Sequence, residues 1–425
     1  MNAAPPAPST ARRPPAHPFV YTLLIAPFGA TFGFVGVALA FLATRNGLTV
    51  GDGAALVALG LAPNVWKFCW SPIADLTLSR KRWYLLSCVC CAAGMFAMAA
   101  VPLGPATLHL VGILVLATNV AATFLGFAVE AMVAHLTPAA DRGRVSGWFQ
   151  AGNLGGSGIG GGLGLWLLTN LPAGWQAGLV LAAVTLVCAV PLLWLPDVPA
   201  ERADSVAGAV VALVRDLWTT VWSRNGFLCG LLCFVPVGTG ALSNVLAQAD
   251  VAAYWGAGAH EVELVQGLLF GCVSMVGCVV GGYGCRFFGP RATYGIYGGF
   301  MAAVTAGMAL APHTPATFLG FSLAYALVTG LCYAAFSGFV FDAIGAGNAA
   351  TKYNGFASLS NFPIWYMGLL LAAVETRQGP KAMLYAESGC GVIGIVIFVV
   401  AVLVWRARPA AAAPAAAVAV PAGEA

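Results

Sequence analysis

The chain has 425 residues, of which 60% are hydrophobic and only 8% are charged, and its mean hydropathy is +0.87. A soluble protein of this length needs many more charged residues to cover its surface. The net charge of +4 says little about partners and gives no indication of a nucleic-acid ligand. Apolar runs of about 20 residues, enough to cross a bilayer core, fill most of the sequence. The composition therefore predicts an all-α membrane protein and excludes a barrel, whose strands would alternate polar and apolar residues.

Twelve membrane-spanning helices are expected. In chain order they cover about 19–44, 51–73, 83–103, 106–136, 145–169, 175–195, 226–249, 262–284, 292–311, 315–342, 354–375 and 381–405. The Pro- and Ala-rich segments 1–18 and 409–425 are expected to be disordered cytoplasmic tails. The polar segment 196–225 divides the spans into an amino-terminal bundle, 19–195, and a carboxy-terminal bundle, 226–408.

The linker between the halves has apolar residues at helical spacing over 206–221. This spacing fits an amphipathic helix on the inner membrane face or an ordinary helix packed on the bundle. With the amino terminus in the cytoplasm, 15 of the 19 lysines and arginines fall in cytoplasmic segments. Three fall in outer loops, and Lys67 lies inside a helix. This bias predicts that both termini are cytoplasmic.

A short sequence occurs twice, at an offset of 212 residues. Gly126–Ala131 (GFAVEA) and Gly338–Ala343 (GFVFDA) each place a carboxylate near the cytoplasmic end of the fourth helix of a half. The two carboxylates are those of Glu130 and Asp342. Duplicated six-helix halves are typical of transporters that rock about a site near the middle of the membrane.

The stretch Trp66–Arg82 (WKFCWSPIADLTLSRKR) joins the end of an apolar helix to one aspartate and three cations. It resembles the loop between helices two and three of the major facilitator superfamily, with the pattern G-x-x-x-D-R/K-x-G-x-R/K-R/K. Asp75, Arg80 and Lys81 hold the acidic position and the last two basic positions. The two glycines and the first cation of the pattern are replaced, by Ser71, Leu78 and Leu76.

More specifically, the chain is similar to the branch containing bacterial anhydromuropeptide permeases, acetyl-coenzyme A transporters and some siderophore permeases. The similarity is in Trp66–Asp75 (WKFCWSPIAD), in Pro138–Arg144 (PAADRGR) before a Gly-rich helix, and in Lys352-Tyr353-Asn354 before the eleventh span. It implies the major facilitator fold of two pseudo-symmetric six-helix bundles, and a secondary transporter of a bacterial inner membrane. These motifs serve gating and structure, so they specify the substrate poorly.

Charged residues on the inner side are expected to form a gate. The residues assigned to it are Asp75, Arg80, Lys81, Arg82, Arg142 and Arg144. The carboxylate of Asp75 can pair with the cations after it or cap the amino terminus of an adjacent helix. Such contacts are expected to hold one closed state and to break in the other. The alternative is a solvated inner loop that only obeys the charge bias.

Three ionisable residues inside predicted spans are candidates for proton coupling: Lys67, Glu130 and Asp342. A charge within the membrane is costly, so it needs a partner or must change its protonation. The alternatives are a structural pair between Lys67 and Glu130, and salt bridges from each carboxylate to loop cations. Glu375 and Glu387 lie nearer the outer ends of their helices and are weaker candidates.

Polar and aromatic residues in the middle of the spans are expected to line a substrate pocket, because pockets are mostly apolar with a few placed polar groups. The set is Phe32, Asn64, Trp66, Asn119, Gln150, Asn153, Asn244, Gln248, Tyr325, Tyr333, Asn361 and Trp365. Each one alone fits a helix-packing contact as well. The Gly-rich helix 152–164 formally contains GxGxxG but has no preceding strand, so it predicts close helix packing and not a dinucleotide site.

The sequence contains no Asp-rich motif, catalytic His/Asp pair or Cys/His cluster with metal spacing, so no enzyme, metal or cofactor is expected. The Gly-rich helix also lacks the Gly-Pro pair of drug antiporters, which favours uptake over export. We expect a monomeric, proton-coupled importer of a small polar or amphipathic solute that works by alternating access in the bilayer. An exporter of the same fold and, less favoured, a membrane-embedded transferase are the alternatives.

Overall fold

The computed structural model describes residues 17–200, 206–265, 269–345 and 348–407, and all regular elements in these ranges are helical. Most of the two expected tails and part of the linker lie outside them. The first half contains α1 (Phe19–Gly33), the π-helix η1 (Phe34–Leu39), α2 (Ala40–Arg45), α3 (Val50–Trp66), η2 (Lys67–Cys69), α4 (Ser71–Leu76), α5 (Arg80–Ala100), α6 (Leu108–Leu136), η3 (Ala139–Asp141), α7 (Arg142–Asn170), α8 (Gly174–Val187) and η4 (Val190–Leu193). The remaining helices are α9 (Val206–Trp222), α10 (Arg224–Phe234), α11 (Leu242–Leu246), α12 (Ala249–Ala253), α13 (Ala259–Leu264), α14 (Phe270–Phe288), α15 (Pro290–Leu310), α16 (Pro315–Ile344), α17 (Ala349–Gln378) and α18 (Pro380–Ala407).

Within the described residues, eight helical stretches are able, by length and composition, to cross a membrane on their own. They match eight of the twelve predicted spans, and α3, α7, α10 and α15 correspond to the other four. Of these four, α3 and α10 are short, and α7 and α15 are rich in glycine and polar residues. The predicted all-α membrane fold is confirmed.

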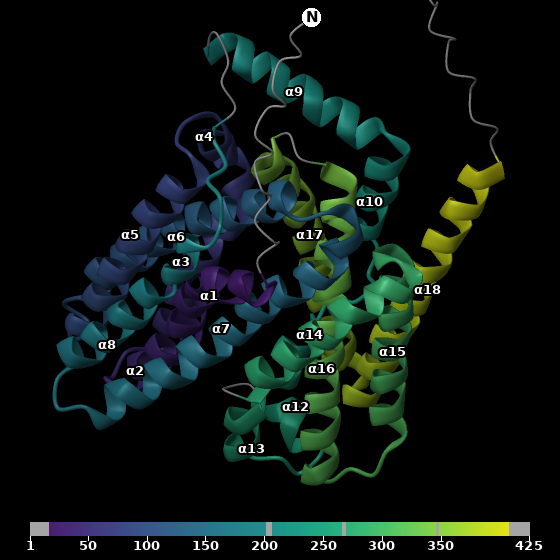
Figure 1. The fold of residues 1–425 in the computed structure, drawn as a ribbon. Coiled ribbons are helices and arrows are strands. Elements are labelled where there is room, and N and C mark those ends of the chain that lie inside the picture. Colours follow the sequence, from purple (N-terminus) through teal and green to yellow (C-terminus); the bar gives the residue numbers. More distant parts are fainter. Residues whose placement is uncertain (1–16, 201–205, 266–268, 346–347, 408–425) are drawn as a thin grey trace, which may run out of the picture.

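The helices gather in two groups (Figure 1). Helices α1 to α8 form one group, α10 to α18 form the other, and α9 lies across one end of both. We call the end that carries α9 the linker face and the opposite end the far face. The two groups lean apart toward the far face (Figure 1).

Close approach of helices explains the glycines of α7. Its glycines at 152, 156 and 160 face α1, where a Cβ added to Gly29 would lie 2.0 Å from the Asn153 carbonyl oxygen. A second row of α7 glycines faces α14 of the second half. A Cβ added to Gly158 would lie 2.7 Å from the Cα of Gly271. Helix α7 is thus packed between its own half and the partner half, as small residues permit.

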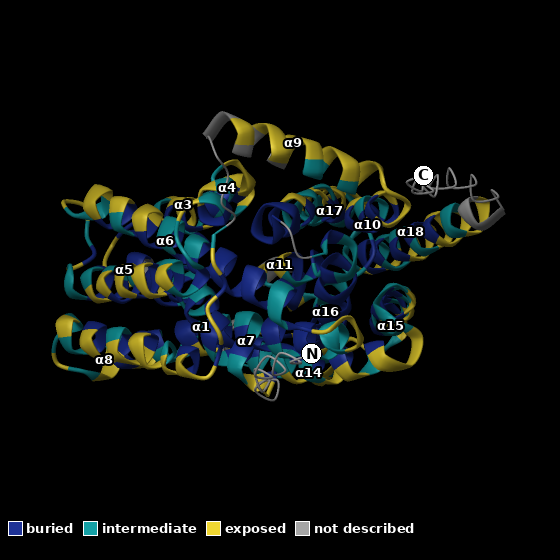
Figure 2. Ribbon diagram, turned by 45° about the horizontal axis from the view of Figure 1, so that its top comes forward, coloured by how far each residue is buried: buried dark blue, intermediate teal, exposed yellow. Residues whose placement is uncertain are grey.

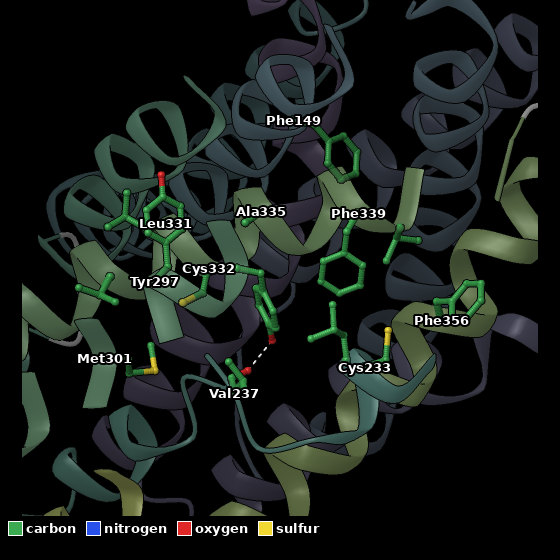
Figure 3. Packing of buried hydrophobic residues seen from close by; sticks show 14 of the residues in the cluster. Phe149, Cys233, Val237, Tyr297, Met301, Leu331, Cys332, Ala335, Phe339 and Phe356 are labelled. Carbon is green, nitrogen blue, oxygen red and sulfur yellow. Dashed lines mark hydrogen bonds between the residues drawn. The ribbon is translucent and has the colours of Figure 1, made fainter. Parts of the chain in front are cut away.

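The predicted span 226–249 is not one continuous helix. Helix α10 ends at Phe234, and the chain is unwound until α11 begins. Pro236 lacks an N–H and disfavours helical backbone at the residue before it, and Gly238 and Gly240 have φ of 63° and 71°, which suit glycine. Tyr294 of α15 donates a hydrogen bond to the carbonyl of Val237 (dashed line in Figure 3). We call residues 235–241 the unwound segment.

Buried residues concentrate where the two groups meet, and exposed residues lie on the outer surfaces of helices such as α5 and α8 (Figure 2). Many exposed side chains are large and apolar, such as Ile113 on α6 and Leu403 on α18. An apolar outer surface on this scale suits contact with lipid rather than water.

Candidate substrate cavity and gate

A cavity of about 270 Å³ lies between the two halves, and both halves line it. Helices α1, α3, α6 and α7 contribute from the first half, and α10, α15, α16, α17 and the unwound segment contribute from the second. The aromatic lining residues are Phe28, Phe32, Phe149, Tyr294, Tyr333, Phe336 and Tyr353. The cavity therefore suits a small solute with apolar and polar faces.

Two opposite charges line the cavity from the first half. Lys67 is only 8% exposed, and its Nζ lies 5.7 Å from the ring centre of Phe28. Glu130 is 4% exposed and interacts electrostatically with Lys67. Its Oε2 accepts a 2.6 Å hydrogen bond from Nδ2 of Asn354 on α17. The buried carboxylate thus touches both the cavity and the opposite half.

A polar network crosses between the halves on another wall. Gln150 of α7 donates a 2.5 Å hydrogen bond to the hydroxyl of Ser337 on α16, which lies 2.8 Å from the hydroxyl of Tyr353. Asn153 donates a 2.9 Å bond to Oε1 of Gln150. Both amide side chains line the cavity, so a solute that occupies it meets groups already tied to the opposite half.

A buried carboxylate joins the halves at the linker face. Asp75 forms a 3.0 Å ion pair with Arg80, and both side chains are fully buried. Its second oxygen accepts hydrogen bonds from the backbone N–H of Thr351, at 2.9 Å, and from the hydroxyl of Thr351, at 2.7 Å. Asp75 thereby caps the first turn of α17, where the amide groups have no partner within the helix. Arg80 also donates to the carbonyl of Ala74.

Arg142, at the start of α7, makes the second charged contact between the halves. Its Nη1 donates a 3.0 Å hydrogen bond to the carbonyl of Phe341 and lies 3.9 Å from Oδ1 of Asp342. The side chain of Asp342 is 34% exposed, so this predicted coupling residue lies at the gate and not in the cavity. Arg144 pairs with Asp141 on its own half at 3.3 Å.

The other two predicted gate cations, Lys81 and Arg82, contribute less to the charged contacts of the gate. Lys81 is half-buried, and its backbone N–H donates to Asp197 at 3.2 Å, while Arg82 is exposed. Neither side chain forms an ion pair within the described ranges. They lie beside the gate, at the start of α5.

The linker helix is fastened to the same end of α17. Asp216 of α9 accepts a 2.9 Å hydrogen bond from Asn348 and forms a 3.1 Å ion pair with Lys352. The amino-terminal turn of α17 therefore receives one carboxylate from the first half and one from the linker. Any movement of α17 must change both contacts.

The predicted pocket residues divide into two sets. Those that line the cavity are Phe32, Asn64, Gln150, Asn153, Tyr333 and Asn361. Those that lie outside its lining are Trp66, Asn119, Asn244, Gln248, Tyr325 and Trp365. Trp66 and Trp365 are 58% and 64% exposed, and Asn119 donates to the Val115 carbonyl of its own helix. Tyr325 bonds to Glu387 within the second half.

Several residues that make contacts between the halves are not predicted from the sequence. Thr351, Asn354 and Ser337 supply the second-half partners of Asp75, Glu130 and Gln150. The motif Lys352-Tyr353-Asn354 marks this segment, but a single sequence contains no signal for which residues it would meet. Nothing in the sequence singles out Asp216.

Comparison with known proteins identifies the family. The sequence model of the Major Facilitator Superfamily matches residues 21–368. The chain belongs to the major facilitator superfamily. It is accordingly a multi-pass membrane protein and a secondary transporter of small molecules, and not an enzyme. No curated protein sequence matches significantly.

Solved transporters share the fold at low sequence identity. The human organic anion transporter MFSD10 (TETRAN) has a TM-score of 0.66 and 16% identity, over 91% of this chain and 100% of its own. The proton:xylose symporter XylE bound to 6-bromo-6-deoxy-D-glucose has a TM-score of 0.65 and 13% identity, over 92% and 96%. The E. coli fucose:proton symporter FucP has a TM-score of 0.66 and 16% identity, over 90% and 98%. These likenesses establish the major facilitator fold.

Proposed function

We propose that this transporter imports a small polar or amphipathic solute together with protons, by alternating access. The observation that carries the proposal is the position of Glu130. Its carboxylate lines the cavity, interacts electrostatically with Lys67 and accepts a hydrogen bond from the opposite half. A single group that contacts the solute space and both halves can couple protonation to their relative movement.

Protonation of Glu130 removes the negative charge that Lys67 faces and weakens its charge-assisted bond to Asn354. The weakened bond to Asn354 acts on the first turns of α17, which also carry the contact with Asp75. Loss of the bond between Glu130 and Asn354 therefore favours release of the contact between Asp75 and Thr351. In this mechanism the proton and the solute together open the linker face, and loss of the proton restores its closure.

The chemistry of the cavity supports a small solute. Its polar groups are mainly amides and hydroxyls, including Asn64, Asn361 and Ser360, and Lys67 balances the charge of Glu130. Such a lining suits a neutral or zwitterionic molecule with several hydrogen-bonding groups. Oδ1 of Asn64 is buried and has no hydrogen-bond partner among the described residues.

We further propose that the linker face is cytoplasmic, that the protein acts as a monomer, and that the membrane is a bacterial inner membrane. The cations beside the gate support this orientation. In it, the contacts of Asp75, Arg142 and Glu130 close the cytoplasmic side, and the divergence of the halves faces outward (Figure 1). The similarity to permeases of muropeptides, siderophores and coenzyme A esters supplies solute classes for testing.

The experiment is uptake into proteoliposomes with and without an inward proton gradient. The solutes are a panel of muropeptides, siderophores, coenzyme A esters and monosaccharides. We expect one class to accumulate only when the gradient is present. Glu130→Gln should exchange this solute without responding to the gradient, whereas the control Glu375→Gln, a half-buried residue outside the cavity lining, should behave as the wild type. Uptake by the wild type that does not depend on the proton gradient would contradict proton coupling.

A further inference from the structure

A second carboxylate is buried far from the gate, in the second half. Glu387 of α18 is 6% exposed. Its Oε1 accepts a 3.1 Å hydrogen bond from the hydroxyl of Tyr325 on α16. Its Oε2 is buried and has no hydrogen-bond partner among the described residues. Unlike Glu130, this carboxyl group does not line the cavity.

The surroundings of Glu387 contain no balancing charge. None of the ion pairs in the described part of the chain includes it. The titratable groups that face it or its turn are Tyr325, Cys390 on its own helix, and Tyr366 of α17 beside Cys390. From α15, the neighbouring turn presents the carbonyl of Ala302, which is not titratable. An unpaired charge inside a membrane protein is costly, so the structure favours a protonated carboxyl group here.

The same pair supports the unwound segment. The hydroxyl of Tyr325 also interacts with the backbone of Leu242, the first residue of α11 and the residue that follows this segment. One and two turns after Glu387, glycines let α18 approach this segment. A Cβ added to Gly391 would lie 3.9 Å from the carbonyl oxygen of Pro236, and one added to Gly394 would lie 2.8 Å from Cγ2 of Val237. The other side of the segment lines the cavity.

We propose that Glu387 and Tyr325 form a second proton-binding site, behind the unwound segment, and that loss of its proton loosens that segment. The proposal rests on the proton-coupled function but concerns a separate group. Oε2 is the atom that carries the proton, because Oε1 accepts the bond from Tyr325. When the proton leaves to water, the remaining charge has only a neutral hydroxyl beside it. The segment must then move to hydrate the charge, and the cavity wall moves with it.

Infrared difference spectroscopy between pH values tests the site without a known solute. The samples are the full-length protein in lipid nanodiscs, as wild type, Glu387→Gln, Tyr325→Phe, Glu130→Gln and the control Glu375→Gln. We expect a titrating carbonyl stretch of a protonated carboxyl group that is lost only in Glu387→Gln and shifted in frequency in Tyr325→Phe. A spectrum unchanged by Glu387→Gln would overturn the proposal. A band lost only in Glu130→Gln would do so too, while leaving the proposed coupling residue in place.

Hydrogen–deuterium exchange tests the structural consequence. After correction for the intrinsic pH dependence of amide exchange, amides of residues 235–241 should exchange several-fold faster above the titration of the band than below it. In Glu387→Gln, which mimics the protonated group, the corrected exchange should stay slow at every pH. A corrected exchange rate that does not change with pH in the wild type, or the same pH response in the variant, would overturn the link to the unwound segment. If Glu387→Gln folds poorly, the frequency shift of the carbonyl band in Tyr325→Phe tests the site instead.

Discussion

Removing the hydroxyl of Thr351 should open the gate at the linker face. Thr351→Val preserves the shape of the side chain and removes the 2.7 Å bond to Asp75, while the 2.9 Å bond from its backbone N–H remains. A hydrogen bond to a charged group contributes about 1.5–3 kcal/mol. Because about 1.4 kcal/mol is a tenfold change in an equilibrium, the closed state should lose stability by roughly ten- to 150-fold relative to the open state.

The assay is a distance measurement between spin labels at Arg82 and Arg224, exposed positions at the linker-face ends of the two halves. The twelve native cysteines make non-natural amino acids the appropriate label sites. We expect a longer-distance population to grow in Thr351→Val. Thr305→Val is the matched control, because among the described residues its hydroxyl bonds only to carbonyls of its own helix. Identical distance distributions in the wild type and both variants would refute a gating role for the Asp75 contact.

Three further predictions concern other contacts between the halves. Asp216→Asn removes a partly exposed ion pair with Lys352, worth about 0.2–1 kcal/mol, so the same distance measurement should shift less than in the threonine variant; an equal or larger shift would contradict this ranking. Gly158→Val should lower the unfolding temperature, because overpacking against Gly271 costs about 1–3 kcal/mol, and an unchanged thermal melt would speak against that contact. Gln150→Leu should weaken solute binding about two- to 12-fold through loss of one hydrogen-bonding group, worth about 0.5–1.5 kcal/mol. Equal solute affinity in a binding titration would place the solute elsewhere.

The sequence predicts the membrane class and the position of the gate for clear physical reasons. Long apolar runs with few charges admit almost no other fold. Asp75 is an acid followed closely by cations where apolar sequence ends, so an ion pair or a helix cap is expected, and the structure contains both. Its partner Thr351 is 276 residues away, and no local pattern indicates that distance.

The cavity is harder to predict because the spans are apolar on nearly every face. Helical periodicity then cannot separate residues that face lipid from residues that face the cavity. Trp66 and Trp365 are largely exposed and lie outside the cavity lining, whereas Asn64 and Asn361, a few residues away, line the cavity. Hydropathy does not predict the unwound segment because it averages over Pro236, although a proline followed by nearby glycines is a recognisable helix breaker.

Proton movement into proteoliposomes during solute uptake tests the proposed coupling most directly. A pH-sensitive dye in the lumen records acidification after a transported solute is added outside. In the wild type, acidification should accompany uptake and scale with it. In Glu130→Gln, solute exchange should continue without acidification. Solute uptake by the wild type with no change of lumenal pH would contradict proton coupling through this carboxylate.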